Sequence, residues 1–220
     1  MKLENITEKT GRRYDDACGT AHGLELIGER WALLVVRELM FGPKRFGDLR
    51  AGLPGLSANV LTQRLEGLEV AGLVVRRKLP PPASVQVYDL TDWGREAEPI
   101  ISALGRWAAR SPGHDPTLPL SPTSMMLSFR TMFDARKAGA AAMTLGFRFG
   151  SEQFVVRVRD GVLTAAREDD GQAQVQIDGT PEAVAAIVYG GAGLATVSVS
   201  GDVGVFERFA KFFELPPKAG

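Results

Sequence analysis

The sequence has little of what disulfides, metal sites and membrane spans require. Its one cysteine, Cys18, cannot form an internal disulfide, and its two histidines, His22 and His114, are too few and too far apart for a zinc-site spacing. No apolar run approaches the roughly twenty residues of a membrane span, and no basic, apolar leader opens the chain. We therefore expect no metal, no cofactor, no membrane partner and a cytoplasmic location.

Catalytic motifs are missing as well. We find no nucleophile paired with a base and no close carboxylate pair. A phosphate-binding loop is also missing, because the glycines near Gly190 and Gly193 follow a helix and lack a lysine motif. The chain is thus expected not to be an enzyme.

Charge is balanced over the whole chain and unbalanced locally. The 26 Lys and Arg residues equal the 26 Asp and Glu residues, yet the segment from Lys44 to Lys78 carries a net charge of +4. A basic patch in a neutral protein fits a polyanionic partner that touches one face, although a solvated charged surface gives the same count.

A composition break divides the 220 residues. Residues 111–122 contain four prolines and no periodicity, which indicates a linker. We predict a first domain over residues 1–110, a linker over 111–121 and a second domain over 122–215.

The first domain is predicted to be helical with one hairpin. An apolar stretch over 24–40 indicates helix, bent near Gly28, and a short helix follows over 45–52. The next helix lies between Ser57, a good N-cap, and Gly72, a good terminal residue. Strands over 73–79 and 85–90 then flank a Pro-rich tip, and Thr91 caps a final helix kinked at Pro99.

The helix after Ser57 is predicted to bury one face and expose another. At 100° per residue Leu61, Leu65 and Leu68 share a face, whereas Asn59 and Gln63 point away from it and Thr62 lies on the flank. The outward residues either solvate an amphipathic helix or bind something.

Helices joined by a short Gly-containing turn and followed by a hairpin form a winged helix-turn-helix. Its second helix fits the DNA major groove, where amide side chains read base edges, and a basic hairpin reaches flanking phosphates. The predicted DNA-binding residues are Lys44, Arg45, Ser57, Asn59, Thr62, Gln63, Arg64, Arg76, Arg77 and Lys78.

This half resembles the HxlR-type winged-helix regulators of bacteria. The resemblance rests on residues 24–31 (LELIGERW), 42–46 (GPKRF), 53–57 (LPGLS), 60–65 (VLTQRL) and 71–74 (AGLV). It implies a transcription regulator, most often a repressor, that binds double-stranded DNA as a homodimer formed by the terminal helices of the domain.

The same resemblance makes Cys18 a candidate redox sensor, because several members carry a reactive thiol there. A helix N-terminus lowers a thiol pKa, whereas Asp15 and Asp16 oppose the thiolate. The alternative is an inert cysteine in an apolar corner.

The second half predicts an α+β domain with an antiparallel sheet and flanking helices. Helices are expected from Pro122, over 180–189 and over 205–213, and strands over 142–149, 153–158, 162–165 and 174–177, with a hairpin turn at Asp160-Gly161.

This half resembles sterol-carrier-protein-like domains at Asp160-Gly161, 175–182 and 197–202. The resemblance implies an apolar cavity for a hydrophobic small-molecule effector. The candidate pocket residues are Met125, Phe129, Phe133, Phe147, Phe206 and Phe209, which would otherwise complete a core or a dimer interface.

Together these features predict a homodimeric DNA-binding regulator, a repressor by family resemblance, whose second domain senses a hydrophobic ligand or assists dimerisation. The competing hypothesis is a lipid-binding or carrier protein whose helical half serves only for dimerisation.

Overall fold

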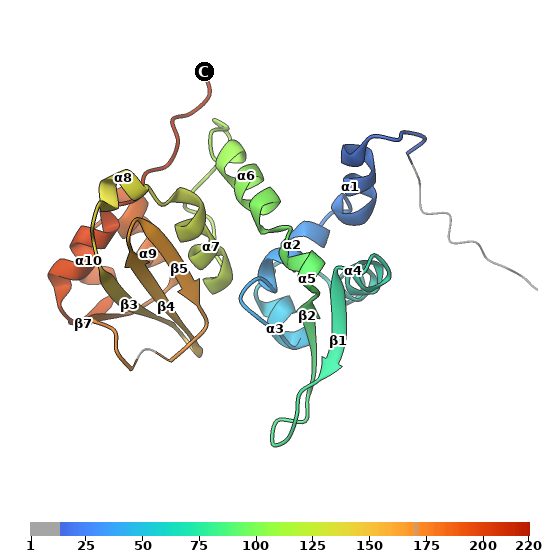
Figure 1. The fold of residues 1–220 in the computed structure, drawn as a ribbon, viewed down its shortest axis with the longest axis horizontal. Coiled ribbons are helices and arrows are strands. Elements are labelled where there is room, and N and C mark those ends of the chain that lie inside the picture. The colour runs from blue at the N-terminus through green and yellow to red at the C-terminus, as the bar shows by residue number, and fades with distance from the viewer. Residues whose placement is uncertain (1–13, 170) are drawn as a thin grey trace, which may run out of the picture.

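Two lobes lie side by side in the computed structural model, which describes residues 14–169 and 171–220 (Figure 1). The predicted order of helices and hairpin in the first lobe is confirmed. The elements of this lobe are α1 (Gly19–Ile27), α2 (Ala32–Glu38), α3 (Phe46–Ala51), α4 (Ala58–Val70), β1 (Val74–Lys78), β2 (Gln86–Leu90), α5 (Asp92–Arg95) and α6 (Glu98–Ala108).

Local signals fix the ends of these helices. The Ser57 hydroxyl accepts a hydrogen bond from the Val60 amide at the start of α4, and Gly72, with φ of 75°, turns the chain after its end. The expected bend near Gly28 is a full break, because Trp31 is in the left-handed region at φ 79°. The final helix is likewise split, with Pro99 in the first turn of α6.

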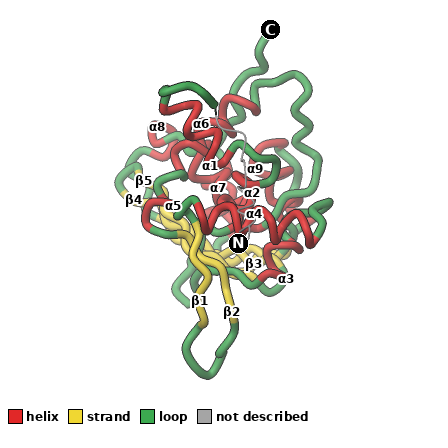
Figure 2. The backbone as a smooth tube through the Cα atoms, turned by 90° about the vertical axis from the view of Figure 1, so that its right-hand side faces the viewer, coloured by secondary structure: helices red, strands yellow, loops and turns green. Residues whose placement is uncertain are grey.

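The hairpin extends away from the helices as a wing (Figure 2). Strands β1 and β2 pair antiparallel from Val74 opposite Leu90 to Lys78 opposite Gln86. The backbone of Lys44 exchanges two hydrogen bonds with Tyr88, of 3.0 and 2.9 Å. The segment before α3 is therefore held to the base of the wing.

The second lobe is α+β, as predicted, with a five-stranded sheet in the order β5-β4-β3-β6-β7. Its elements are α7 (Pro122–Met132), α8 (Ala135–Ala138), β3 (Met143–Phe149), β4 (Glu152–Arg159), β5 (Val162–Ala166), β6 (Val175–Asp178), α9 (Pro181–Gly190), a 3-10 turn at Leu194–Thr196, β7 (Ser198–Gly201) and α10 (Val203–Ala210).

The expectation of an antiparallel sheet needs one correction. Strands β3 and β6 pair in parallel, because the chain crosses from the edge strand β5 to the other side of β3 before forming β6. The remaining pairs are antiparallel, and the turn at Asp160 and Gly161 has the two positive φ values, 52° and 74°, of a tight hairpin.

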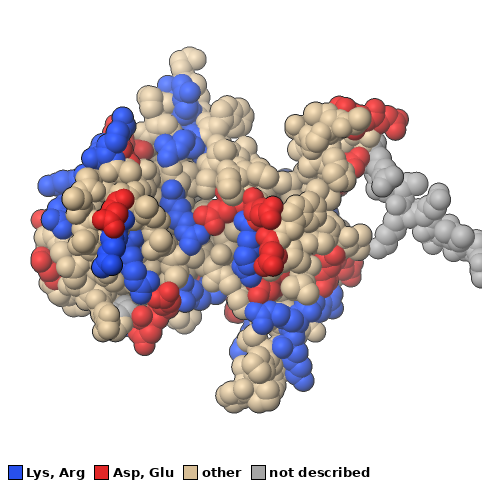
Figure 3. All heavy atoms as spheres, viewed as in Figure 1, with Lys and Arg blue, Asp and Glu red and all other residues tan. Residues whose placement is uncertain are grey.

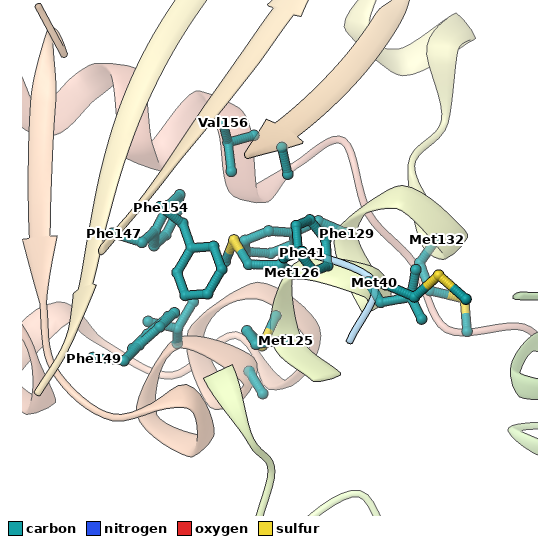
Figure 4. Close-up of a cluster of buried hydrophobic side chains, with 14 of the residues drawn as sticks. Met40, Phe41, Met125, Met126, Phe129, Met132, Phe147, Phe149, Phe154 and Val156 are labelled. Carbon is teal, nitrogen blue, oxygen red and sulfur yellow. The ribbon is translucent and has the colours of Figure 1, made fainter. Parts of the chain in front are cut away.

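The apolar core continues from one lobe into the other (Figure 4). Phe41, which follows α2, meets Phe154 of β4 edge to face, with ring centroids 5.7 Å apart. Met125 and Met126 of α7 lie fully buried in the same cluster. The lobes therefore share buried surface, and the predicted boundaries at 110 and 121 stay a prediction.

A buried polar junction joins the lobes beside this core. Glu38, fully buried at the end of α2, accepts hydrogen bonds from Lys44 at 2.9 Å and from the Ser121 hydroxyl at 2.6 Å. The Lys44 ammonium, 3% exposed, also donates to the Thr123 hydroxyl at 3.1 Å. A side chain at Gly52 would meet the Glu38 carboxylate at 2.7 Å, so α3 ends directly against the junction.

We predict that Lys44→Met lowers the free energy of unfolding by about 1–3 kcal/mol, because the buried Glu38 carboxylate loses its ammonium partner and keeps only the partly exposed Arg37 guanidinium as a cationic partner. Urea unfolding followed by circular dichroism measures the change. Arg45→Met at the exposed neighbour is the control and should change the free energy by less than about 0.5 kcal/mol. Equal effects of the two substitutions would contradict the role assigned to the junction.

Candidate nucleic-acid interface

Helix α4 is anchored by its leucines. Leu61, Leu65 and Leu68 are at most 1% exposed and pack into the first lobe, as the periodicity predicts. Asn59, Thr62 and Gln63 are exposed on the outer side. The packing of the leucines thus fixes which side chains the helix presents to solvent.

The outward side chains of α4 differ in whether their hydrogen-bonding groups already have partners within the protein. The Thr62 hydroxyl donates to the Ala58 carbonyl at 3.0 Å, and the Ser57 hydroxyl is occupied as the helix cap. The amides of Asn59 and Gln63 make no hydrogen bond within the described part of the chain. These two amides therefore keep both a donor and an acceptor for a partner.

The wing carries the basic side chains predicted for it (Figure 3). Arg76 pairs with Glu69 of α4 at 2.9 Å, and Arg77 pairs with Asp89 of β2 at 2.6 Å. The hydrogen bond that Arg76 donates to Glu69 raises the pKa of Arg76 above its usual value. Lys78 is exposed and makes no ion pair with any residue that the structure describes.

Two of the predicted DNA-binding residues have side chains that are engaged within the protein. The prediction for Lys44 is wrong, because the side chain is buried in the junction with Glu38. Arg64 is directed toward the break between α1 and α2, where it donates to the Arg30 carbonyl at 2.9 Å and pairs with Glu29 at 3.0 Å. Arg45, just before α3, is exposed as expected.

Cys18 is exposed at the N-cap of α1, so the apolar corner considered from the sequence is absent from this conformation. Its pKa is lowered, chiefly by a hydrogen bond from the Thr20 amide, with the Thr20 hydroxyl and the Ala21 amide adding to the effect. The first turn of α1 therefore favours the thiolate.

The six residues expected to line a ligand pocket form a packed aromatic core. Phe129 lies 5.3 Å from Phe147 and 5.1 Å from Phe209, measured between ring centroids. Five of the six are fully buried, namely Met125, Phe129, Phe147, Phe206 and Phe209. Phe133 is partly exposed. A cavity of about 1180 Å³ lies instead between the lobes, and none of the six lines it. Their role in binding a ligand stays a prediction.

Helix α6 has an apolar stripe that no residue within 14–169 and 171–220 covers. Ile100, Leu104 and Trp107, spaced to share one side of the helix, are 55%, 46% and 72% exposed. Leu24 of α1 is also 49% exposed. The two terminal helices of the first lobe therefore present unpartnered apolar surface.

Helix α4 is anchored by its leucines on the preceding helices, and the basic hairpin of β1 and β2 follows it. This arrangement defines a winged helix-turn-helix DNA-binding protein. Residues 26–115 match the family model described as HxlR-like helix-turn-helix. Over 86 residues the chain is 40% identical to the HTH-type transcriptional regulator YvaP of Bacillus subtilis, covering 39% of this chain and 79% of YvaP. It is 35% identical over 83 residues to YodB of the same organism, covering 38% of this chain and 74% of YodB. The chain belongs to the HxlR-like family and is a DNA-binding transcriptional regulator.

The second half matches a different family from the one expected. Residues 115–219 match the model described as alkyl sulfatase C-terminal, and the resemblance to sterol-carrier proteins is not confirmed.

Two solved structures each align with less than half of this chain. The reduced form of YodB is 30% identical, covers 46% of this chain and all of its own, and has a TM-score of 0.40. The sec-alkylsulfatase Pisa1 from Pseudomonas is 23% identical, covers 43% of this chain and 16% of its own, and also scores 0.40.

Within residues 14–169 and 171–220, no helix is both long and apolar enough to cross a membrane. In the same residues, no three His, Cys, Asp or Glu side chains are grouped so that they could hold a metal ion.

We predict that Cys18 is alkylated by iodoacetamide at a lower pH in the folded protein than in the unfolded chain, because hydrogen bonds from α1 favour the reactive thiolate. The rate measured against pH should reach half its maximum below the midpoint seen for the same protein in urea. Since Cys18 is the sequence's one cysteine, both curves report one site. A folded midpoint at or above the unfolded one would contradict the assignment.

Proposed function

We propose that the protein acts as a homodimeric, sequence-specific repressor in which α4 reads bases in the major groove. The observation that carries this proposal is the pair of exposed, unbonded amides of Asn59 and Gln63 on a helix anchored by buried leucines. An Asn or Gln amide matches the donor and acceptor of adenine in the major groove, so each side chain can bond one base with two hydrogen bonds.

The wing is proposed to contact phosphates. Arg76, Arg77 and Lys78 are consecutive on β1 and exposed, and salt bridges to Glu69 and Asp89 hold the two arginines in place. Such contacts add affinity for any sequence and position the helix, whereas the bases supply the discrimination.

Dimerisation is proposed through the exposed apolar surface of α6 and α1. A stripe with Trp107 at 72% exposure resembles the apolar centre of an interface more than a solvated helix face. A two-fold axis there would place two copies of α4 on one side of the DNA, about one helical turn apart.

The second lobe is proposed to carry control by a hydrophobic small molecule rather than catalysis. Relatives of the first lobe are named as transcriptional regulators, which supports a non-enzymatic role for the chain. The competing hypothesis of a lipid carrier loses its basis, because it required the helical half to serve only for dimerisation. The proposal that Cys18 senses oxidants rests on its exposure and lowered pKa.

We predict that Gln63→Ala and Asn59→Ala each relax discrimination at one base pair by about 1–3 kcal/mol, because each removes a two-bond contact to a base. Equilibrium competition among duplexes with single base substitutions measures the loss. Glu66→Ala, one turn further along the exposed side, is the control: it should strengthen binding to every duplex without reordering them. Unchanged ranking in all three variants would overturn the assignment of α4.

We predict that Arg77→Gln lowers the salt slope of DNA binding by about 0.9, the value for one lost phosphate contact. Arg157→Gln is a matched control, because Arg157 also pairs with one carboxylate, that of Glu168 at 2.7 Å, and its side chain is 47% exposed against 45% for Arg77. Arg157 lies on β4 in the second lobe, outside the proposed surface, so its substitution should leave the slope unchanged. The wing assignment fails if the two slopes change equally.

A further inference from the structure

The cavity between the lobes is lined by residues from three parts of the chain. The first lobe contributes Trp31 and the 51–54 segment that leads toward α4, the connecting segment contributes Leu118, and the second lobe contributes Glu152 and Arg167. Its volume is about 1180 Å³, which is more than a small organic molecule needs.

Charged side chains form an alternating chain along one wall. Arg37 pairs with Glu38 at 3.0 Å, Glu38 with Lys44 at 2.9 Å, Lys44 with Glu152 at 3.8 Å, and Glu152 with Arg167 at 2.6 Å. Three cations thus share two carboxylates. The chain has one positive charge more than its own carboxylates neutralise, in a place where burial weakens the screening by water.

Arg167 is the end of this chain that lacks an acceptor. Its Nε is buried and has no hydrogen-bond partner, while its terminal nitrogen holds Glu152 and its guanidinium lies 5.4 Å from the centre of the Phe154 ring. A buried donor without an acceptor is costly, and the Arg167 side chain as a whole is 28% exposed and lines the cavity, so a ligand oxygen that reaches its guanidinium would be stabilised.

The other carboxylates that line the cavity are already engaged. Asp48 accepts a hydrogen bond from the Arg45 amide, Glu168 pairs with Arg157 at 2.7 Å, and Asp169 also has an interaction partner. The lining as a whole holds three cations and four carboxylates, so the positive excess is local to the chain of ion pairs that ends at Arg167.

Part of the cavity lining is apolar and exposed. Leu118 is 60% exposed and Leu34 is 37% exposed, and Trp31 and Pro54 lie in the same lining. Apolar surface beside an unsatisfied guanidinium matches a molecule with a hydrophobic body and one anionic head.

We propose that the cavity between the lobes binds an amphipathic organic monoanion, with its head on Arg167 and its body against Trp31 and Leu118. Binding at this site does not depend on DNA. Its use in regulation rests on the proposed function, since the occupant would touch the 51–54 segment that precedes α4 and so favour one orientation of the reading helix.

Isothermal titration of the full chain with submicellar decanoate tests the site, with decanol as the uncharged comparison. We expect decanoate to bind and decanol to bind about ten-fold more weakly or worse, because only the anion satisfies the guanidinium. Arg167→Gln should weaken decanoate about ten-fold. The matched control is Arg148→Gln, since Arg148 also has a buried Nε without a partner and a single carboxylate nearby, but lies outside the cavity.

A second pair of variants tests the site independently, in case Arg167→Gln does not fold. Leu118→Glu places a negative charge in the cavity mouth and should abolish decanoate binding, whereas Val162→Glu, at the same 60% exposure on β5, should leave it unchanged. Failure of decanoate to bind, equal binding of decanol, or equal effects within either pair of variants would overturn the proposal.

A duplex titration with and without decanoate separates the site from its regulatory use. By linkage, the ligand must change DNA affinity by the same factor as DNA changes ligand affinity. A bound ligand with unchanged DNA affinity would keep the site and reject the coupling. Loss of DNA binding altogether would count against the proposed function and leave the ligand titration intact.

Discussion

The leucine face of α4 is the constraint on which the account of this protein depends. Leu61, Leu65 and Leu68 are buried at the centre of the first lobe, so α4 cannot rotate without exposing them to water. Burial of one face therefore determines that Asn59 and Gln63 face outward. The base of the wing is tied to the same unit, because Glu69 of α4 holds Arg76 of β1. Helix α4, which we propose reads bases, and strand β1, which we propose contacts phosphates, are therefore held together.

The junction around Glu38 extends this order to the second lobe. Its carboxylate lies against Gly52 at the end of α3 and bonds Ser121 at the start of α7, so one buried group touches both the DNA-binding unit and the sheet domain. A buried ion pair of this kind contributes little net stability but is intolerant of losing either partner. It makes the relative position of the lobes specific, and the cavity beside it is the place where a bound molecule would alter that position.

The sequence predicted what local physics determines. Ser57 and Gly72 mark the ends of α4 because capping and left-handed turns act over a few residues, and the leucine spacing alone gives the outward amides. The prediction for Lys44 is wrong because its burial depends on a remote segment: Glu38 is six residues away, whereas Thr123, which also accepts a hydrogen bond from Lys44, lies 79 residues away. The parallel pairing of β3 with β6 and the short strand β7 also depend on contacts between remote segments. Phenylalanines in a sequence, finally, do not show whether their rings pack against one another or line a cavity, because that depends on contacts between remote segments such as Phe129 with Phe147 and Phe209.

Selection of bound duplexes from a random pool by the unmodified protein, repeated at two salt concentrations, is the most direct test of the claim that α4 reads DNA. The account predicts an enriched inverted repeat whose half-sites lie about 10 base pairs apart, with the same consensus at both salt concentrations. Retention of duplexes without any enriched sequence, or no retention at low salt, would contradict it.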